Sequence, residues 1–177
     1  MSRDTFPSPE KCVEMLKEQG CSPAVVEHCK AVKDVAVRIA ECANADKKLV
    51  EIAALLHDIG RAKTHGIRHG IEGAAIARKL GLSEKIVCII ERHLGAGISK
   101  EEAEKLGLPP KDYIPETLEE KIVAHADNLI EYNHVQNIEM EIERQMRSKN
   151  YEYAKRLREL HDELSRVCGK DLNELLE

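Results

Sequence analysis

The most restrictive feature of the sequence is a histidine and an aspartate that stand side by side at the end of an apolar run. The run begins at Leu49, the pair is His57 and Asp58, and Gly60 follows two residues later. A carboxylate is almost never fully buried unless it is paired or holds a metal ion. Packing alone therefore does not explain the pair, and the fold has to bring partners to it.

Partners of the same chemical kind occur in other apolar segments. His28 precedes the pair, and His69, His93 and Asp127 follow it. Imidazole and carboxylate together suit borderline divalent ions such as Fe, Mn, Ni, Co or Zn. The sequence has no Cys-x-x-Cys pair, so a structural zinc site is not expected. These residues are candidates for a site that binds divalent transition metals.

The order of these residues resembles the HD-domain superfamily of metal-dependent phosphohydrolases. Residues 57–60 match the His-Asp-Ile-Gly string of its HDIG subgroup. The resemblance covers about residues 24–132 and implies an all-α fold, the HD-domain helical bundle. We expect residues 1–177 to form a single HD domain, with a helical C-terminal extension over about residues 135–177.

The resemblance also implies a set of metal ligands. The defining tetrad of the family corresponds to His28, His57, Asp58 and Asp127. His69 and His93 match the two additional histidines of members that hold two metals. They would bind a second ion, which Asp58 would bridge to the first. In such sites the ions are about 3.5–4 Å apart.

The implied activity is that of a metal-dependent phosphohydrolase, either a phosphomonoesterase or a phosphodiesterase. A hydroxide held by the metal ions would attack the phosphorus of a nucleotide or a related small phosphate ester. Asp58, as the bridging carboxylate, would be essential for catalysis. Two other functions stay open: a di-iron oxygenase of the HD fold, and a non-catalytic metal-binding module.

Basic residues follow the His-Asp-Ile-Gly string directly. Arg61 can form two parallel hydrogen bonds to a phosphate, and Lys63 can add a point charge. His65 either donates a proton to the leaving oxygen or is an ordinary loop residue. Arg61 could instead cap the helix that ends at Gly60, because a cation near the carbonyl end of a helix is favourable.

Every long segment of the chain is predicted to be helical, since no strand-like alternation of apolar residues is sustained. Ser-Pro pairs at Ser8 and Ser22 begin the first two helices, and Gly20 ends the first. Capping boxes at Ser99 and Thr117 begin two later ones. The remaining expected helices run over about residues 46–59, from residue 69, over about residues 83–93, and from about residue 138 on as one long helix or two in line, with a weak point near residues 148–150.

The last predicted helix has a coiled-coil-like apolar seam. Its members follow a 4-3-4-3 spacing: Tyr153, Leu157, Leu160, Leu164 and Val167. The seam either packs on the core of the same chain or joins two copies in a homodimer. Among the other histidines, His125 is about 200° around a helix from Asp127 and should face away from the metal. His134 and His161 carry no pattern and are expected at the surface.

Composition limits the partners. The formal net charge is -5, with acidic and basic residues interspersed, which disfavours a nucleic-acid-binding surface and a polybasic membrane anchor. No apolar run approaches the roughly 20 residues that span a bilayer. The first residues contain no apolar signal region. We therefore expect a cytoplasmic protein whose partner is a small phosphorylated substrate.

Cysteines do not form a disulfide pattern. The chain has six, and most fall inside helix-like runs, where small buried thiols are common. Reduced cysteines are the preferred interpretation. A bridge between Cys12 and Cys21 is the one alternative, because disulfides occur inside the cells of some hyperthermophiles.

Overall fold

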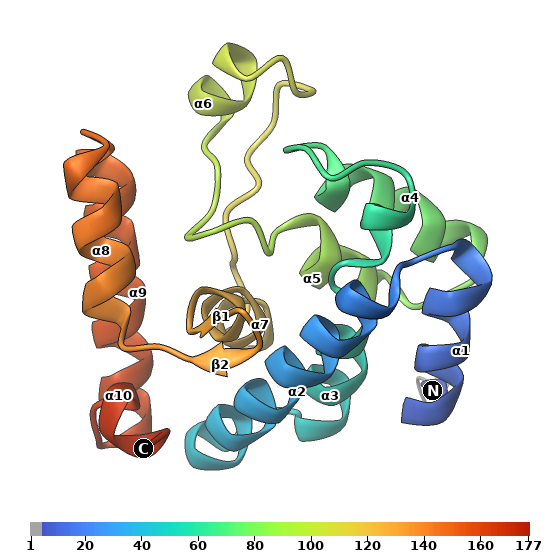
Figure 1. Ribbon diagram of the computed structural model, residues 1–177, viewed down its shortest axis with the longest axis horizontal. Helices are drawn as coiled ribbons and strands as arrows, with labels where there is room; N and C mark the ends of the chain where they lie inside the picture. Colours follow the sequence, from blue (N-terminus) through green and yellow to red (C-terminus); the bar gives the residue numbers. More distant parts are fainter. Residues whose placement is uncertain (1–4) are drawn as a thin grey trace.

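The computed structural model describes residues 5–177, and helices dominate them, as the sequence predicts (Figure 1). The first part of the chain contains α1 (Pro9–Gln19), α2 (Pro23–Ala43), α3 (Lys47–Leu56), the 3-10 helix η1 (Ile59–Ala62), α4 (His69–Lys79), α5 (Glu84–Glu91), α6 (Lys100–Lys105) and α7 (Leu118–Asn128). The C-terminal part contains α8 (Ile138–Arg147), α9 (Tyr151–Cys168) and α10 (Leu172–Leu175). A small antiparallel ribbon between the two parts was not predicted: β1 (Ile130–Glu131) pairs with β2 (His134–Val135).

Polar side chains fix the N-termini of the first helices where the sequence indicates. The hydroxyl of Ser8 accepts a hydrogen bond from the amide of Lys11 at 3.1 Å, and that of Ser22 accepts one from Val25 at 3.3 Å. Each bond satisfies an amide that has no partner inside its helix. Gly20 ends α1 in the left-handed conformation, with φ at 96°. The predicted boundaries of α1 and the start of α2 are therefore confirmed.

The two predicted capping boxes differ. Ser99 and Glu102 form a complete box at the start of α6. At α7, Thr117 accepts from the amide of Glu120, but the carboxylate of Glu120 turns to another amide, that of Glu116. The reason is a competing cation, since Glu120 is buried and both its oxygens bind the guanidinium of Arg92 at 3.0–3.1 Å.

Helices α3 and α5 end earlier than predicted. Helix α3 stops at Leu56 rather than near residue 59, and Asp58 leaves the helical conformation with φ at -98° and ψ at 15°. Helix α5 stops at Glu91, so His93 lies beyond it. The sequence-based boundaries are wrong because contacts with α4 decide where the chain turns. A Cβ on Gly60 would be 1.8 Å from the carbonyl oxygen of His69, so the backbone of η1 rests directly on α4.

Small residues on α4 permit this close packing. Gly70, Gly73, Ala74 and Ala77 are all buried, as expected for a stripe that faces neighbouring helices. A Cβ on Gly73 would be 2.8 Å from Cγ2 of Ile90 on α5. The stripe therefore holds α4 against both η1 and α5, and it brings the segments that carry the candidate ligands together.

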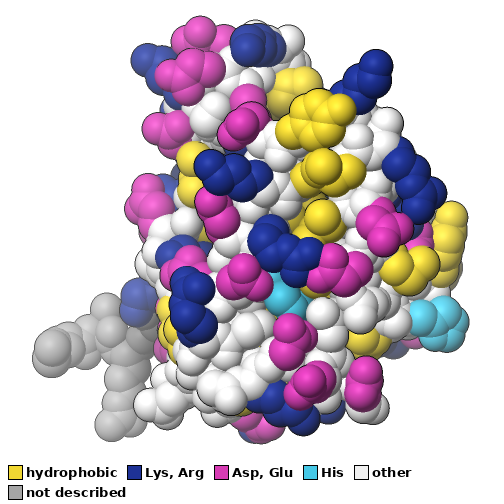
Figure 2. All heavy atoms as spheres, turned by 90° about the vertical axis from the view of Figure 1, so that its left-hand side faces the viewer, with side chains coloured by type: hydrophobic (Ala, Val, Ile, Leu, Met, Phe, Trp, Pro, Cys, Tyr) yellow, Lys and Arg dark blue, Asp and Glu magenta, His cyan; other side chains and the backbone are white. Residues whose placement is uncertain are grey.

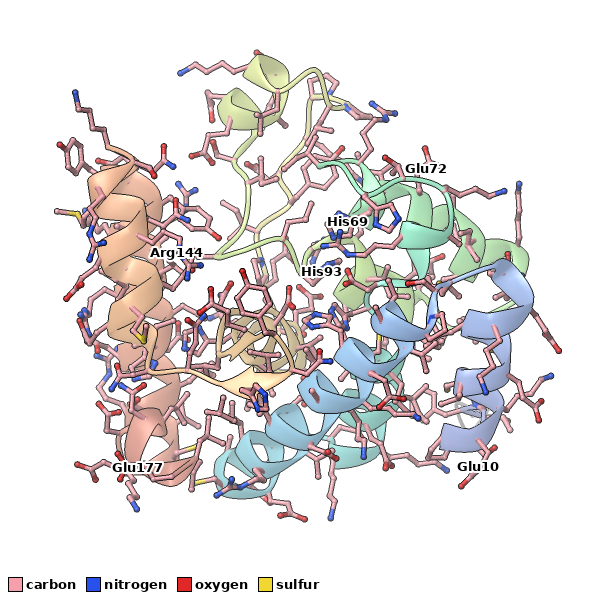
Figure 3. All side chains as sticks on the ribbon, in the orientation of Figure 1. Glu10, His69, Glu72, His93, Arg144 and Glu177 are labelled. Atoms are coloured by element: carbon pink, nitrogen blue, oxygen red, sulfur yellow. The ribbon has the colours of Figure 1, made fainter. Side chains whose placement is uncertain are left out.

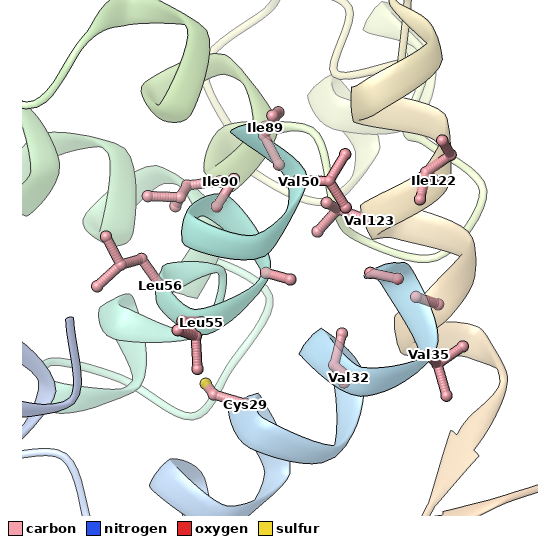
Figure 4. Packing of buried hydrophobic residues seen from close by; sticks show 14 of the residues in the cluster. Cys29, Val32, Val35, Val50, Leu55, Leu56, Ile89, Ile90, Ile122 and Val123 are labelled. Carbon is pink, nitrogen blue, oxygen red and sulfur yellow. The ribbon is translucent and has the colours of Figure 1, made fainter. Parts of the chain in front are cut away.

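The core lies where α2, α3, α5 and α7 meet (Figure 4). The side chains that meet there are aliphatic and almost fully buried: Val32, Val35, Leu55, Leu56, Ile89, Ile90, Ile122 and Val123. Burying one such side chain contributes about 1.5–3 kcal/mol to stability. This core fixes the helices from which the candidate site is built.

The C-terminal helices fold back on each other. Helices α8 and α9 lie side by side (Figure 1), joined by a turn in which Lys149 has a positive φ of 61°. The predicted weak point near residues 148–150 is confirmed, but the arrangement of two helices in line is wrong. The middle of the apolar seam, Leu157, Leu160 and Leu164, is buried in the same cluster as the residues of α2 and α7. The chain's own core therefore occupies the seam.

All six cysteines lie in the described part of the chain and are free thiols, so Cys12 and Cys21 do not pair. Burial raises the pKa of Cys12 to about 12 and that of Cys21 to about 11, so both are protonated at neutral pH. Among residues 5–177, none of the helices is both long and apolar enough to cross a lipid bilayer.

Candidate metal centre

All six residues that the sequence singles out as ligands converge on one place. They come from different segments of the bundle: His28 from α2, His57 and Asp58 from the junction of α3 and η1, His69 from the first residue of α4, His93 from just beyond α5, and Asp127 from α7. Figure 3 labels His69 and His93 in the space between α4, α5 and α2. We call these six residues the His–Asp cluster.

Asp58 lies at the centre of the cluster, and its two carboxylate oxygens face different histidines. Oδ1 is 3.2 Å from Nε2 of His69 and 3.3 Å from Nε2 of His93. Oδ2 is 3.7 Å from Nε2 of His28 and 3.7 Å from Nε2 of His57. The side chain of Asp58 is only 2% exposed, so these contacts take place away from bulk water.

Asp127 completes the side of the cluster that Oδ2 of Asp58 faces. Its Oδ1 is 2.9 Å from Nε2 of His28 and 3.5 Å from Nε2 of His57. The ligand atoms of these three residues all lie within 4.8 Å of one another, as do those of His57, Asp58 and His93. Two overlapping groups of potential ligands therefore exist, and they have His57 in common.

Backbone carbonyls orient three of the rings. Nδ1 of His57 is 2.7 Å from the carbonyl oxygen of Ala54, and Nδ1 of His93 is 2.6 Å from that of Ile90. Nδ1 of His69 lies in the same way 2.8 Å from a carbonyl oxygen in the preceding loop. A carbonyl can only accept, so each Nδ1 carries the proton, and in a neutral ring Nε2 then presents its lone pair to the cluster.

This arrangement fits a cation. Nε2 of His69 and Nε2 of His93 are 3.0 Å apart, and two lone pairs at that distance require a proton or a metal ion between them. Nε2 of His57 and Oδ1 of Asp58 are buried and have no hydrogen-bond partner. Buried polar atoms are rarely left unpaired, and one reason for an exception is a missing ion. The donor set, imidazole with carboxylate, is that of borderline divalent metals.

The electrostatics of the cluster also favour positive charge. Burial would raise the pKa of Asp58, but the charge of His57 and the nearby imidazoles of His69 and His93 hold it well below its usual range. Burial would lower the pKa of His57, but the charge of Asp58 raises it well above its usual value. Without a metal the cluster therefore attracts protons, and metal ions would compete with them.

The basic residues that follow Gly60 differ in whether they contact the cluster. Nε of Arg61 donates to Oδ2 of Asp58 at 2.7 Å, and its Nη1 donates to the carbonyl oxygen of His65 at 3.3 Å. The side chains of Lys63 and His65 are exposed. Neither makes a hydrogen bond or an ion pair with the cluster in the described part of the chain. Of the three, only Arg61 is thus brought to the cluster by the fold.

A pair of histidines outside the cluster links α7 to α9, and the sequence analysis missed it. Nε2 of His125 is 2.9 Å from Nδ1 of His161, whose Nε2 is 3.3 Å from Oδ1 of Asp171. Both rings are fully buried, so the expectation of a surface position for His161 is wrong. His161 is four residues after Leu157 on the apolar seam, and this spacing could have indicated its burial. His134 is exposed, as expected.

Comparisons with known proteins identify a family model for the first part of the chain and relatives that match most of its length. The HD domain family model matches residues 25–132. A tRNA (cytidine(56)-2'-O)-methyltransferase of Picrophilus torridus is 46% identical over 170 residues, which are 96% of this chain and 50% of that protein. The chain therefore spans about half the length of that relative. An uncharacterized protein of Methanocaldococcus jannaschii is 49% identical over 166 residues, 89% of this chain and 97% of that protein.

Among solved structures, the HD domain of the L. monocytogenes phosphodiesterase PgpH is similar to this chain. The TM-score is 0.56 at 17% sequence identity, over 94% of this chain and 99% of that one. The same domain has been solved in complex with cyclic-di-AMP. At this level of identity the likeness concerns the fold. Since the family model covers more than half of the chain, and the M. jannaschii protein matches over nearly its whole length, the chain belongs to the HD-domain family.

Proposed function

We propose that this protein is a metal-dependent phosphohydrolase and that the His–Asp cluster is its active site. The observation that carries the proposal is the position of Asp58, whose two oxygens face separate sets of imidazole lone pairs. A carboxylate between two ligand sets is the arrangement that a pair of bridged metal ions requires. Family membership supports the same reaction class.

The proposed ligand sets follow the geometry. His28, His57 and Asp127 would hold one ion, His69 and His93 would hold the other, and Asp58 would contribute one oxygen to each. Divalent ions bound there would supply Lewis acidity toward phosphate oxygens and would lower the pKa of a bound water. The residues of the chain fix the ligand atoms in advance, because backbone carbonyls hold three of the rings and the packing of η1 on α4 holds Asp58.

Arg61 is proposed as a contact to the substrate phosphate. Its Nε and Nη1 are bonded to Asp58 and to the backbone of His65, while Nη2 donates to no residue of the described chain. The guanidinium is therefore held beside the cluster with donor capacity left. Lys63 and His65 are exposed in the loop that follows, where we propose that Lys63 adds positive charge and that His65 donates a proton to the leaving oxygen.

We propose a nucleotide or a related small phosphate ester as the substrate. The PgpH domain has been solved with a cyclic dinucleotide, so phosphodiesters of nucleotides belong in the first set of compounds to test. This chain spans about half of the P. torridus methyltransferase. Imidazoles and carboxylates around a metal are suited to hydrolysis rather than to methyl transfer.

Metal analysis combined with a phosphate-release assay tests this function. The purified protein is expected to bind up to two divalent ions and to release phosphate from nucleotides or to cleave bis(p-nitrophenyl) phosphate with Mn, Co or Ni. Asp58→Asn keeps the size of the side chain and should abolish both metal retention and turnover. Bound iron that changes oxidation state without any phosphate release would favour the oxygenase. Bound metal without any turnover would favour the binding module.

A further inference from the structure

A cavity of about 680 Å³ lies between the loop after α5, helix α6 and the junction of α8 and α9. Its apolar and aromatic lining comprises Ile67, Leu94, Ile98, Leu106, Tyr151 and Tyr153. Figure 2 shows apolar side chains gathered on the upper part of the face that α8 and α9 present, with charged side chains around them. Sites for small molecules typically have volumes of about 300–1,000 Å³ and mostly apolar walls.

The cavity is connected to the cluster by the segment that follows His93. Leu94 and Gly95 line it and directly follow His93 in the chain. From the opposite wall, Tyr153 of α9 reaches Gly95 so closely that a Cβ there would be 2.0 Å from the tyrosine hydroxyl oxygen. Burial, with the nearby charges of Glu141 and Asp127, raises the pKa of Tyr153 to about 12. The phenol therefore lines the cavity and is near enough to Asp127 to be affected by its charge.

Polar groups in the wall lack partners. The hydroxyl of Tyr153 makes no hydrogen bond within the described residues, although the side chain is packed against the core. Arg156, three residues later on the same helix face, uses Nη2 to bind the carbonyl of Gly97 and the carboxylate of Glu102. Its Nε is buried and has no partner. Tyr153 lines the cavity, and its hydroxyl is therefore free to bind a ligand there.

We propose that this cavity holds the base and sugar of a nucleotide whose phosphate lies on the His–Asp cluster. The inference rests on the proposed function and names its substrate class. A base has flat faces, which aromatic and aliphatic walls such as Tyr151 and Leu106 can cover, and a polar edge, which the hydroxyl of Tyr153 can bind. The C-terminal helices would then provide the wall that selects the substrate, while the first part of the chain provides the ligands for the metal.

Calorimetric binding measurements test the proposal without relying on turnover. The probes are the 5′-monophosphates of adenosine, guanosine, cytidine and uridine, with inorganic phosphate as the base-free reference, each with and without Mn²⁺. At least one nucleotide is expected to bind more tightly than phosphate in both conditions. Tyr153→Phe removes only the hydroxyl and should weaken that binding about three- to tenfold, the effect of one hydrogen bond. Binding of inorganic phosphate and metal content should not change.

A second variant acts through the size of the cavity. Leu106 lines the cavity and is 50% exposed, so Leu106→Trp should fill the space without disturbing the core, and it should weaken nucleotide binding more than about tenfold. Matched controls are Tyr132→Phe and Val167→Trp, at exposed positions outside the cavity, and both should bind as the wild type does. If no nucleotide binds more tightly than phosphate, or if both cavity variants bind like the controls, the proposal is overturned. Absence of bound metal would contradict the proposed function alone, because nucleotide binding to the metal-free protein is measured separately.

Discussion

Nε of Arg61 donates a hydrogen bond to Oδ2 of Asp58 at 2.7 Å, three residues back along the chain. The first basic residue after the His-Asp-Ile-Gly string is thus bound to a proposed metal ligand. The oxygen that it binds is the one that faces His28 and His57. The bond keeps the guanidinium where a phosphate held by the cluster would meet it.

Replacing Arg61 separates the role of its charge from that of its shape. Arg61→Lys keeps the charge but cannot form two parallel hydrogen bonds, so catalytic efficiency should already fall. Arg61→Ala should lose roughly 2–3 kcal/mol of transition-state stabilisation, the order of one charge-assisted contact. Metal content should stay unchanged in both, because the six proposed ligands remain. Kinetics and elemental analysis on the same preparations are the measurements. Reduced melting temperature with normal efficiency would instead assign Arg61 to helix capping.

Metal removal should lower stability. A ligand that binds only the folded state at 100 times its dissociation constant stabilises it by about 2.7 kcal/mol. For a chain of this size, that corresponds to a melting temperature about 5–11 °C higher with saturating Mn²⁺ than after treatment with a chelator. Asp58→Asn should show no such shift, because the central ligand is missing. An equal shift in the variant would place the stabilising metal outside the cluster.

His69 and His93 test whether one ion binds or two. Their Nε2 atoms lie 3.0 Å apart, and each is within 3.3 Å of Oδ1 of Asp58. Replacing either by alanine should lower the metal-to-protein ratio by about one and reduce turnover sharply. His28→Ala is the matched control on the other side of Asp58. An unchanged ratio with a raised Michaelis constant would make the two histidines substrate contacts.

The residues of the cluster could be predicted because their order along the chain resembles that of the HD-domain family. His57 and Asp58 also carry a local signal, since they follow an apolar run. Where the helices end could not be predicted in the same way. Helix α3 stops at Leu56 because Gly60 has to rest on α4, a contact between segments that no local pattern contains.

In the C-terminal part, too, local sequence patterns did not predict the contacts between distant segments. The break near residues 148–150 is local and was predicted, but the direction of the chain after it depends on packing. Because α9 folds back, His161 is buried against His125. For the same reason Tyr153 reaches Gly95, more than 50 residues earlier in the chain. The contact between Tyr153 and Gly95 joins segments that are far apart in the sequence. The spacing of the apolar seam indicated only that Tyr153 lies on an apolar face of its helix.

Acid should weaken the contact between α6 and α9. Burial would raise the pKa of Glu102, but the amide of Ser99 and the guanidinium of Arg156 hold it below its usual value of 4.5. A lowered pKa in the folded state means that the carboxylate stabilises the fold above pH 4.5 and that this contribution is lost as the pH falls through the folded-state pKa. Glu102→Gln should therefore unfold more easily than the wild type at neutral pH, and the difference should shrink below pH 4.5. Urea unfolding at several pH values measures it, with Glu104→Gln as the control on the same helix. A difference that does not change with pH would exclude the charge as its cause.

The contact between η1 and α4 should tolerate no side chain at residue 60. A Cβ on Gly60 would lie 1.8 Å from the carbonyl oxygen of His69 and 2.6 Å from the amide nitrogen of Gly73, and both atoms belong to the backbone of α4. Gly60→Ala must push the two segments apart, at a cost on the order of 3 kcal/mol or more. The same shift would move Asp58 away from His69, so metal content should fall as well. Gly66→Ala is the matched control, because its Cβ would meet only the hydroxyl of Thr64 at 3.5 Å. Urea unfolding and elemental analysis of both variants test the prediction, and a Gly60→Ala protein with wild-type stability and metal content would show that the cluster does not depend on this packing.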